Sequence, residues 1–229
     1  MKSTEPSVGI CVVTFRREEQ LIKMLSQVKE RTLYENYKIY IIIDYENDRI
    51  TLKALERNKI IKKMAVEKIE MFPSPVECVK ATNRCYSIGE EPYFVYLSDD
   101  MEVERGWLQE AMKCMQVFLN GKGVVTFQDG VQNGRNACAG LVSRDYIKKE
   151  LNGIFYNEVY KHFRADTELF RKSKAINKIK YCPQSIVWHK HWGKKSKYKS
   201  EKDIVYTQSD RWRKRDKVIF AKRTREGFK

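Results

Sequence analysis

Short apolar runs alternate with amphipathic stretches over the first 120 residues. The apolar runs have the length and the β-branched content of buried strands, and they occupy residues 8–15, 38–44 and 93–97. The stretches that follow them place apolar side chains at helical spacing, over residues 17–31, 51–66, 75–88 and 105–119. This order predicts an α/β fold, with a mostly parallel central sheet flanked by helices on both faces.

The pattern changes after residue 120. Two strand-like runs, 124–127 and 137–142, are joined by a loop, and one or two short helices are expected within residues 156–174. Residues 179–189 are strand-like but contain Pro183. The Lys- and Ser-rich stretch 193–203 predicts a mobile loop, and residues 204–221 predict a basic amphipathic helix. A basic C-terminal extension, 193–229, therefore follows the main α/β unit.

Composition limits the class of protein. The chain has 229 residues and is 42% hydrophobic, which suits one packed domain and excludes a wholly disordered chain. No apolar run reaches 18 residues and no secretory signal precedes residue 8, so we expect no transmembrane segment and a cytoplasmic location. The six cysteines form no C-x-x-C pair, and several lie in apolar runs. They predict reduced, small core residues.

The positive charge is concentrated near the C-terminus. The net charge is +15, and residues 171–229 alone contain 20 Lys and Arg against 5 Asp and Glu. The rest of the chain is therefore balanced. Such asymmetry suggests an anionic partner, which could be nucleic acid, an acidic membrane surface or a phosphorylated substrate. The alternative is a solvated tail without a partner.

Polar side chains end each of the three predicted parallel strands. Thr14 follows the first, Asp44 the second, and Asp99 and Asp100 the third. Ligands of open α/β sheets bind at the carboxyl ends of the strands, so these residues predict a binding site. The glycine-rich fingerprints G-x-G-x-x-G and G-x-x-x-x-G-K-[ST] are absent from these positions, and a nucleotide would bind without a glycine cradle.

Three features could supply chemistry. Adjacent acids in Ser98-Asp99-Asp100 suit a cation such as Mg²⁺ or Mn²⁺, although acids also simply end strands. His189 and His191 lie on one face of the last strand and could include a metal ligand, or form a surface pair. Asp166 opens a helix, where it suits either a cap or a rigidly held general base.

Taken in order, these motifs resemble those of inverting, nucleotide-sugar-dependent glycosyltransferases of the GT-A fold, close to the large family 2. The resemblance extends from about Val8 to Trp192. It rests on Thr14-Phe15-Arg16-Arg17, Asp44, Ala81-Thr82-Asn83, Leu97-Ser98-Asp99-Asp100-Met101 followed by Gly106-Trp107-Leu108, Asp166-x-Glu168-Leu169 with Arg171, and His189. It implies a GT-A catalytic domain over residues 1–192, with a nucleotide-sugar-binding half (about 1–120) and an acceptor and metal half (about 121–192).

The resemblance also implies roles for single residues. The donor would be contacted by Thr14, Phe15, Arg16, Asp44, Asn83 and Asp99. Asp100 and His189 would hold Mn²⁺ or Mg²⁺, and Asp166 would be the catalytic base. Two positions depart from the family pattern. Ser98 replaces the first acid of the D-x-D motif, and Thr82 replaces the usual arginine, so a phosphate or sugar contact would come from Arg84 or elsewhere.

The implied function is metal-dependent transfer of a sugar, with a UDP-sugar as the expected donor, to an acceptor hydroxyl. The surplus positive charge favours a polyanionic acceptor, and we expect DNA carrying a hydroxymethylated base. A lipid-linked or polysaccharide acceptor on an anionic membrane is the alternative, and residues 193–202 could close over the donor diphosphate. Two other classes remain open: a nucleotidyltransferase and a non-catalytic nucleic-acid-binding protein.

Overall fold

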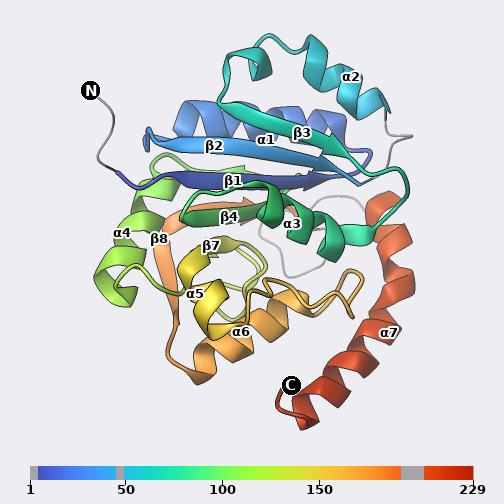
Figure 1. The fold of residues 1–229 in the computed structure, drawn as a ribbon. Coiled ribbons are helices and arrows are strands. Elements are labelled where there is room, and N and C mark those ends of the chain that lie inside the picture. Colours follow the sequence, from blue (N-terminus) through green and yellow to red (C-terminus); the bar gives the residue numbers. More distant parts are fainter. Residues whose placement is uncertain (1–4, 45–48, 192–203, 229) are drawn as a thin grey trace.

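One mixed sheet forms the centre of the molecule (Figure 1). The computed structural model describes residues 5–44, 49–191 and 204–228. The eight strands of the sheet lie in the order β3-β2-β1-β4-β7-β6-β8-β5. Their bounds are β1 Val8–Thr14, β2 Tyr37–Ile43, β3 Val66–Met71, β4 Tyr93–Ser98, β5 Met101–Val103, β6 Val124–Gln128, β7 Gly140–Ser143 and β8 Ile179–His189.

The strand directions confirm the predicted mostly parallel sheet. β1 pairs in parallel with β2 and β4, and β2 pairs in parallel with β3. β7 joins this half to β6 through antiparallel pairs on both its edges, and β6 then pairs in parallel with β8. The carboxyl ends of β1, β2 and β4 consequently meet at one edge.

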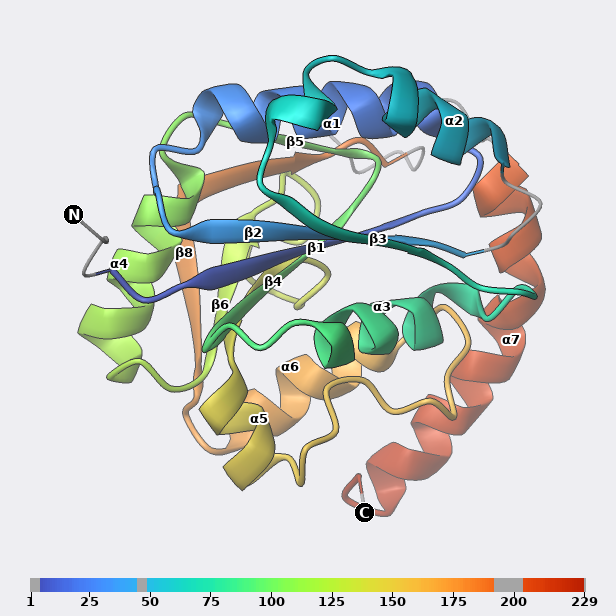
Figure 2. The same ribbon diagram turned by 45° about the horizontal axis from the view of Figure 1, so that its top comes forward.

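Helices cover both faces of the sheet (Figure 2). The helices are α1 Glu18–Arg31, α2 Arg49–Arg57, α3 Glu77–Ile88, α4 Trp107–Leu119, α5 Arg144–Glu150, α6 Ala165–Ala175 and α7 Ile204–Arg225, with a 3₁₀ turn at Ile61–Lys63. Alternate residues of β1 enter two cores. Ile10 and Val12 pack with the apolar faces of α1 and α4, whereas Cys11 packs with α3, α5 and α6. Burial on both faces explains why β1 is apolar throughout.

Several element boundaries differ from the predicted ones. The helix expected over 51–66 ends at Arg57, and the strand β3 was not predicted. β3 is an edge strand whose apolar residues are interrupted by exposed Glu67 and Lys68, so its sequence lacks the signal of a buried strand. Helix α6 confirms a short helix within residues 156–174, whereas α5 was not predicted. The predicted strand 137–142 is Gly140–Ser143.

One pair of cysteines contradicts the reduced state that the sequence predicts. Cys11 of β1 and Cys85 of α3 form a disulfide, with their Cα atoms 5.8 Å apart. Both are buried in the core, as predicted, but they are 74 residues apart and no spacing pattern links them. The other four cysteines are free thiols. Within the described residues, no helix has the length and apolarity needed to cross a membrane.

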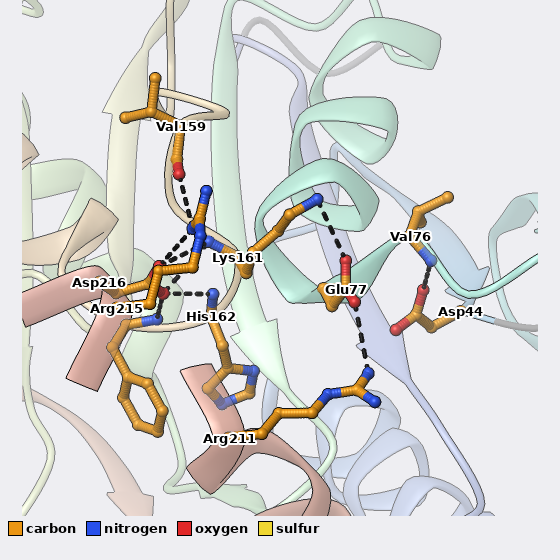
Figure 3. A network of polar contacts seen from close by, with 10 residues as sticks. Asp44, Val76, Glu77, Val159, Lys161, His162, Arg211, Arg215 and Asp216 are labelled. Carbon is orange, nitrogen blue, oxygen red and sulfur yellow. Dashed lines mark hydrogen bonds and ion pairs between the residues drawn. The ribbon is translucent and has the colours of Figure 1, made fainter. Parts of the chain in front are cut away.

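Helix α7 is docked onto the rest of the fold rather than extending from it. Its Asp216 is fully buried and accepts hydrogen bonds from the backbone N–H groups of residues 161–163 (Figure 3). Further along, Arg223 donates two hydrogen bonds of 2.8 Å to the carboxylate of Glu168, which also accepts one from Tyr160. The predicted basic helix is therefore present, and it is an integral part of the folded unit.

The docking of α7 can be tested through the buried ion pair. The side chains of Arg223 and Glu168 are only 14% and 5% exposed. We expect Arg223→Ala to lower the free energy of unfolding by about 3–5 kcal/mol, because Glu168 would remain buried without its cation. The side chain of the neighbouring Lys222 is 70% exposed, so Lys222→Ala should change the free energy of unfolding by less than about 0.5 kcal/mol. Denaturant unfolding measures both, and equal effects would contradict this docking.

Candidate functional site

A cavity of about 390 Å³ opens at the carboxyl ends of β1, β2 and β4. Thr14, Asp44 and Asp99, which were predicted from three strand ends, all line it. In both views α7 stands at this edge of the sheet (Figures 1 and 2). The helix contributes the wall opposite the strands, through Val205, Gln208, Ser209, Arg211 and Trp212. Segments that are distant in the sequence thus enclose one cavity, which is the candidate binding site.

Asp99 organises the loop that follows β1. Its carboxylate accepts hydrogen bonds of 2.8 Å from the hydroxyl of Thr14 and from Nη1 of Arg17, and one of 3.4 Å from the backbone N–H of Phe15. Burial raises the pKa of Asp99 to about 6, against the opposing effect of Arg17. Phe15 and the exposed Arg16 also line the cavity. Asp99 therefore fixes Thr14 and Phe15, two of the residues predicted to contact the nucleotide-sugar.

Asp44 lies at the end of β2 and faces the start of α3. Its Oδ1 accepts a hydrogen bond of 2.9 Å from the backbone N–H of Val76, and burial raises its pKa to about 6. Next to Val76, Glu77 adopts a left-handed backbone with φ 63°. Its carboxylate lies between Lys161, at 3.6 Å, and Arg211 of α7, at 3.4 Å (Figure 3). These contacts define one rim of the cavity.

Asp100 and His189 are adjacent, as the metal-site prediction requires. The antiparallel pairing of β5 with β8 aligns Met101 with His189, and the backbone N–H of Lys190 donates to the carbonyl of Asp100. His189 Nε2 lies 3.5 Å from Asp100 Oδ2. Although burial opposes ionisation, the charges of His189 and Arg17 hold the pKa of Asp100 below its ordinary value, and Asp100 raises the pKa of His189.

The environment of Asp100 fits a bound cation. Its Oδ2 contacts Arg17, His189 and the hydroxyl of Tyr206. Its Oδ1 is buried and has no hydrogen-bond partner among the described residues. A buried carboxylate oxygen normally has a partner, and a divalent ion coordinated by oxygen and imidazole would provide one. The residues present therefore suit Mg²⁺ or Mn²⁺.

Asp166 lies in the first turn of α6, close to the cavity wall. Its Oδ1 accepts from the backbone N–H of Thr167 at 2.7 Å, and its Oδ2 accepts from Asn136 at 2.6 Å. Burial raises its pKa above the ordinary value. Its charge adds to the effect of burial on the pKa values of Cys78 and Tyr156, which both line the cavity. The carboxylate is thus near the site, although it does not itself line the cavity.

Asn83 lies outside the cavity lining. Its Nδ2 donates to the carbonyl of Tyr156 and its Oδ1 accepts from the N–H of the same residue, at 2.8 and 3.0 Å. This pair of bonds fixes the loop that carries Tyr156 into the cavity wall. Thr82 does line the cavity, whereas Arg84 forms an exposed ion pair with Glu70. Arg84, one of the expected sources of a phosphate or sugar contact, is thus outside the cavity lining.

The structure places two further side chains, those of Arg17 and Tyr206, against Asp100. Arg17 contacts both Asp99 and Asp100, and its place in the Thr14–Arg17 motif was a usable signal. Tyr206 of α7 contacts Asp100 from 106 residues away, and nothing in its local sequence marks it. The guanidinium of Arg17 lies 4.8 Å above the Tyr206 ring. The loop 193–202, which was predicted to close over the diphosphate, lies outside the described residues.

Comparison with known proteins identifies the family and the fold of the chain. The model of the family described as Glycosyl transferase family 2 matches residues 9–174, and the chain belongs to this family. Comparison with curated protein sequences finds no match. The fold is that of GT-A glycosyltransferases, as expected from the sequence motifs.

Two solved structures illustrate the similarity. A mannosyltransferase from Pyrobaculum calidifontis, PcManGT, in complex with GDP-Man and Mn²⁺, superposes with a TM-score of 0.69 at 13% identity, covering 84% of this chain and 59% of that one. Residues 1–349 of S. aureus TarS, in complex with UDP-GlcNAc, superpose with a TM-score of 0.67 at 14% identity, covering 82% and 60%. The chain thus spans about 60% of the length of these two structures.

Proposed function

We propose that this protein is a metal-dependent, inverting glycosyltransferase that moves a sugar from a nucleotide-sugar to an acceptor hydroxyl. The observation that carries the proposal is a buried carboxylate oxygen of Asp100 that has no partner among the described residues. Asp100 contacts Arg17, which lines the same cavity as Asp44, and Asp166 lies close to the wall of that cavity. Structural relatives in complex with GDP-Man and Mn²⁺ or with UDP-GlcNAc support a nucleotide-sugar donor. Family usage favours a UDP-sugar.

The residues in and around the cavity would have different roles in the reaction. Thr14, Phe15, Arg16 and Asp44 would contact the nucleoside, and Asp99 would hold the loop that follows β1 in position. Asn83 would act near the donor by fixing the loop at Tyr156. Asp100 and His189 would bind Mn²⁺ or Mg²⁺, which stabilises negative charge on a departing diphosphate. Asp166 would accept the proton of the acceptor hydroxyl, and attack opposite the leaving group inverts the anomeric centre.

A panel of nucleotide-sugars with Mn²⁺ tests this reaction through release of nucleoside diphosphate. We expect release from one or a few of them, with UDP-sugars most active, and loss of release in excess EDTA. Full activity in EDTA would contradict metal dependence. Release of pyrophosphate from nucleoside triphosphates would instead indicate a nucleotidyltransferase. DNA binding without any turnover would indicate a non-catalytic nucleic-acid-binding protein.

For the acceptor, we propose DNA that carries a hydroxymethylated base. The support is the positive charge of α7. This helix forms one wall of the cavity and presents several exposed basic side chains, among them those of Lys214 and Lys217. A donor diphosphate needs only a few cations, so the surplus favours a larger polyanion. A basic helix can also lie on an anionic membrane that bears a lipid-linked or polysaccharide acceptor. Transfer to duplex DNA with and without 5-hydroxymethylated pyrimidines, alongside anionic vesicles, separates these two.

The salt dependence of DNA binding tests the role of α7. Each phosphate contact adds roughly 0.9 to the slope of log affinity against log salt. We expect Lys214→Ala with Lys217→Ala to reduce that slope by about 1.8 while leaving donor hydrolysis unchanged. The control carries Lys113→Ala and Lys149→Ala on α4 and α5, where both lysines are exposed. Equal slopes for both double variants, or binding to vesicles but not DNA, would overturn the DNA proposal.

A further inference from the structure

A second group of metal-ligating side chains lies beside the candidate donor-metal site. Asp129 follows β6, Cys138 precedes β7 and His189 ends β8. One ligand atom from each of the three lies within 4.8 Å of the others. Asp129 is buried, whereas Cys138 and His189 are half-buried. Carboxylate, thiol and imidazole groups from three segments thus converge at one point.

The backbone around Asp129 holds its carboxylate in a fixed orientation. Oδ1 accepts hydrogen bonds from the backbone N–H groups of residues 131–133, at 3.0, 2.7 and 2.8 Å. Oδ2 accepts one of 2.8 Å from Sγ of Cys138. The backbone N–H of His189 donates to the carbonyl of Asp129, which ties the turn to β8. Hydrogen bonds of this kind orient the ligands of metal sites, because they fix a carboxylate before the ion arrives.

We propose that Asp129, Cys138 and His189 bind a thiophilic divalent cation of the Zn²⁺ class. A set of sulfur, nitrogen and oxygen donors favours such an ion over Mg²⁺ or Mn²⁺, which prefer oxygen. Ligands placed tetrahedrally around Zn²⁺ are about 3.3–3.8 Å apart. Sγ of Cys138 and Oδ2 of Asp129, now 2.8 Å apart, would therefore separate by about 0.5 Å, and a pair at the 4.8 Å limit would close by about 1 Å. Cys138 also lines the cavity, which gives the ion a path of entry.

Binding at this site exchanges a proton for the ion. The S–H bond of Cys138 breaks, its proton passes to solvent, and a sulfur–metal bond forms in its place. Oδ2 of Asp129 loses the hydrogen bond from Sγ of Cys138 and would coordinate the metal instead. No electron transfer is involved.

The site shares His189 with the proposed donor-metal site, where Nε2 faces Asp100. If the proposed function holds, a Zn²⁺-class ion therefore competes with Mn²⁺ for this imidazole and lowers turnover. That consequence rests on the proposed function, whereas the site itself does not.

Titration of the full chain with Co²⁺, after stripping by chelator, tests the proposal directly, because a cobalt–thiolate bond gives a charge-transfer band in the near ultraviolet. We expect the band to saturate at one equivalent in the unmodified protein and to be absent in Cys138→Ser. Asp129→Asn should weaken Co²⁺ binding by at least about tenfold. The matched control is Cys78→Ser, which removes another cysteine of the same cavity and should keep the band.

A second measurement guards against misfolded variants. Zn²⁺ should raise the melting temperature of the unmodified protein and of Cys78→Ser, but not that of Cys138→Ser, provided that far-ultraviolet circular dichroism shows each variant folded. The proposal is overturned if no thiolate band appears, if the band survives Cys138→Ser, or if Asp100→Asn abolishes it. Turnover with Mn²⁺ in the absence of a thiolate band would overturn this site and leave the proposed function intact.

Discussion

Asp100→Ala is expected to abolish turnover and to weaken binding of nucleoside diphosphate in the presence of Mn²⁺. The substitution removes the buried Oδ1 that has no partner among the described residues, together with the oxygen that contacts His189. Protein and diphosphate would then lose the link that a divalent ion provides. Sugar transfer and calorimetric binding of the diphosphate, each with and without Mn²⁺, measure the two effects.

Loss of a charge near the site needs its own control. Glu102 is two residues further along, on β5, and its carboxylate pairs with Lys23 at 2.7 Å and Lys190 at 2.6 Å. Glu102→Gln should retain Mn²⁺-dependent diphosphate binding, because the Glu102 carboxylate is already neutralised by these two lysines. If Asp100→Ala binds diphosphate in Mn²⁺ as tightly as the unmodified protein, Asp100 is not a metal ligand.

Asp166→Asn should cut sugar transfer by at least about 10²-fold while donor and metal affinity stay unchanged, because only the proton acceptor is lost. The local fold can tolerate the change. Oδ1 of Asn136 is buried without a partner among the described residues, so a flipped Asn136 amide can accept from the introduced amide. Transfer rates at saturating donor, with separate donor-binding measurements, resolve the two quantities.

A matched variant separates the base from a helix cap. Thr167 donates to Asp166 through both its N–H and its hydroxyl. Thr167→Val removes the hydroxyl bond but keeps the carboxylate, so transfer should change only a few-fold. If Thr167→Val costs as much as Asp166→Asn, or if Asp166→Asn loses donor binding, the role of Asp166 is structural.

The pH profile provides an independent check on the base. Asp166 must be ionised to accept a proton, so transfer falls as the pH drops through its pKa. Burial raises that pKa above the ordinary value of a carboxyl group, whereas the hydrogen bond from Asn136 lowers it. Asn136→Ala should therefore move the acid limb of the profile to higher pH. A shift to lower pH would contradict the assignment.

The sequence by itself determined the parallel half of the sheet and the edge at which ligands bind. β1, β2 and β4 are buried on both faces, so their residues form apolar runs that pattern alone can locate. Because parallel strands end at one edge, the polar residues Thr14, Asp44 and Asp99 were predictable as neighbours without knowledge of the packing.

Other features required the tertiary structure. β3 is an edge strand without a buried-strand pattern, and the Cys11–Cys85 disulfide joins segments that no spacing connects. The positions of β3 and of this disulfide depend on which surfaces pack together. Local sequence periodicity does not contain that information.

The same distinction divides the residues of the site. The motifs named Asp100 and His189 from a family resemblance, but their contact depends on the short pairing of β5 with β8. Tyr206 reaches Asp100 only because Asp216 and Arg223 dock α7 against the loop at 161–163 and against α6. The basic composition of this helix could be predicted from the sequence. Its place as a wall of the cavity depends on buried hydrogen bonds between residues more than 50 positions apart, which no local pattern indicates.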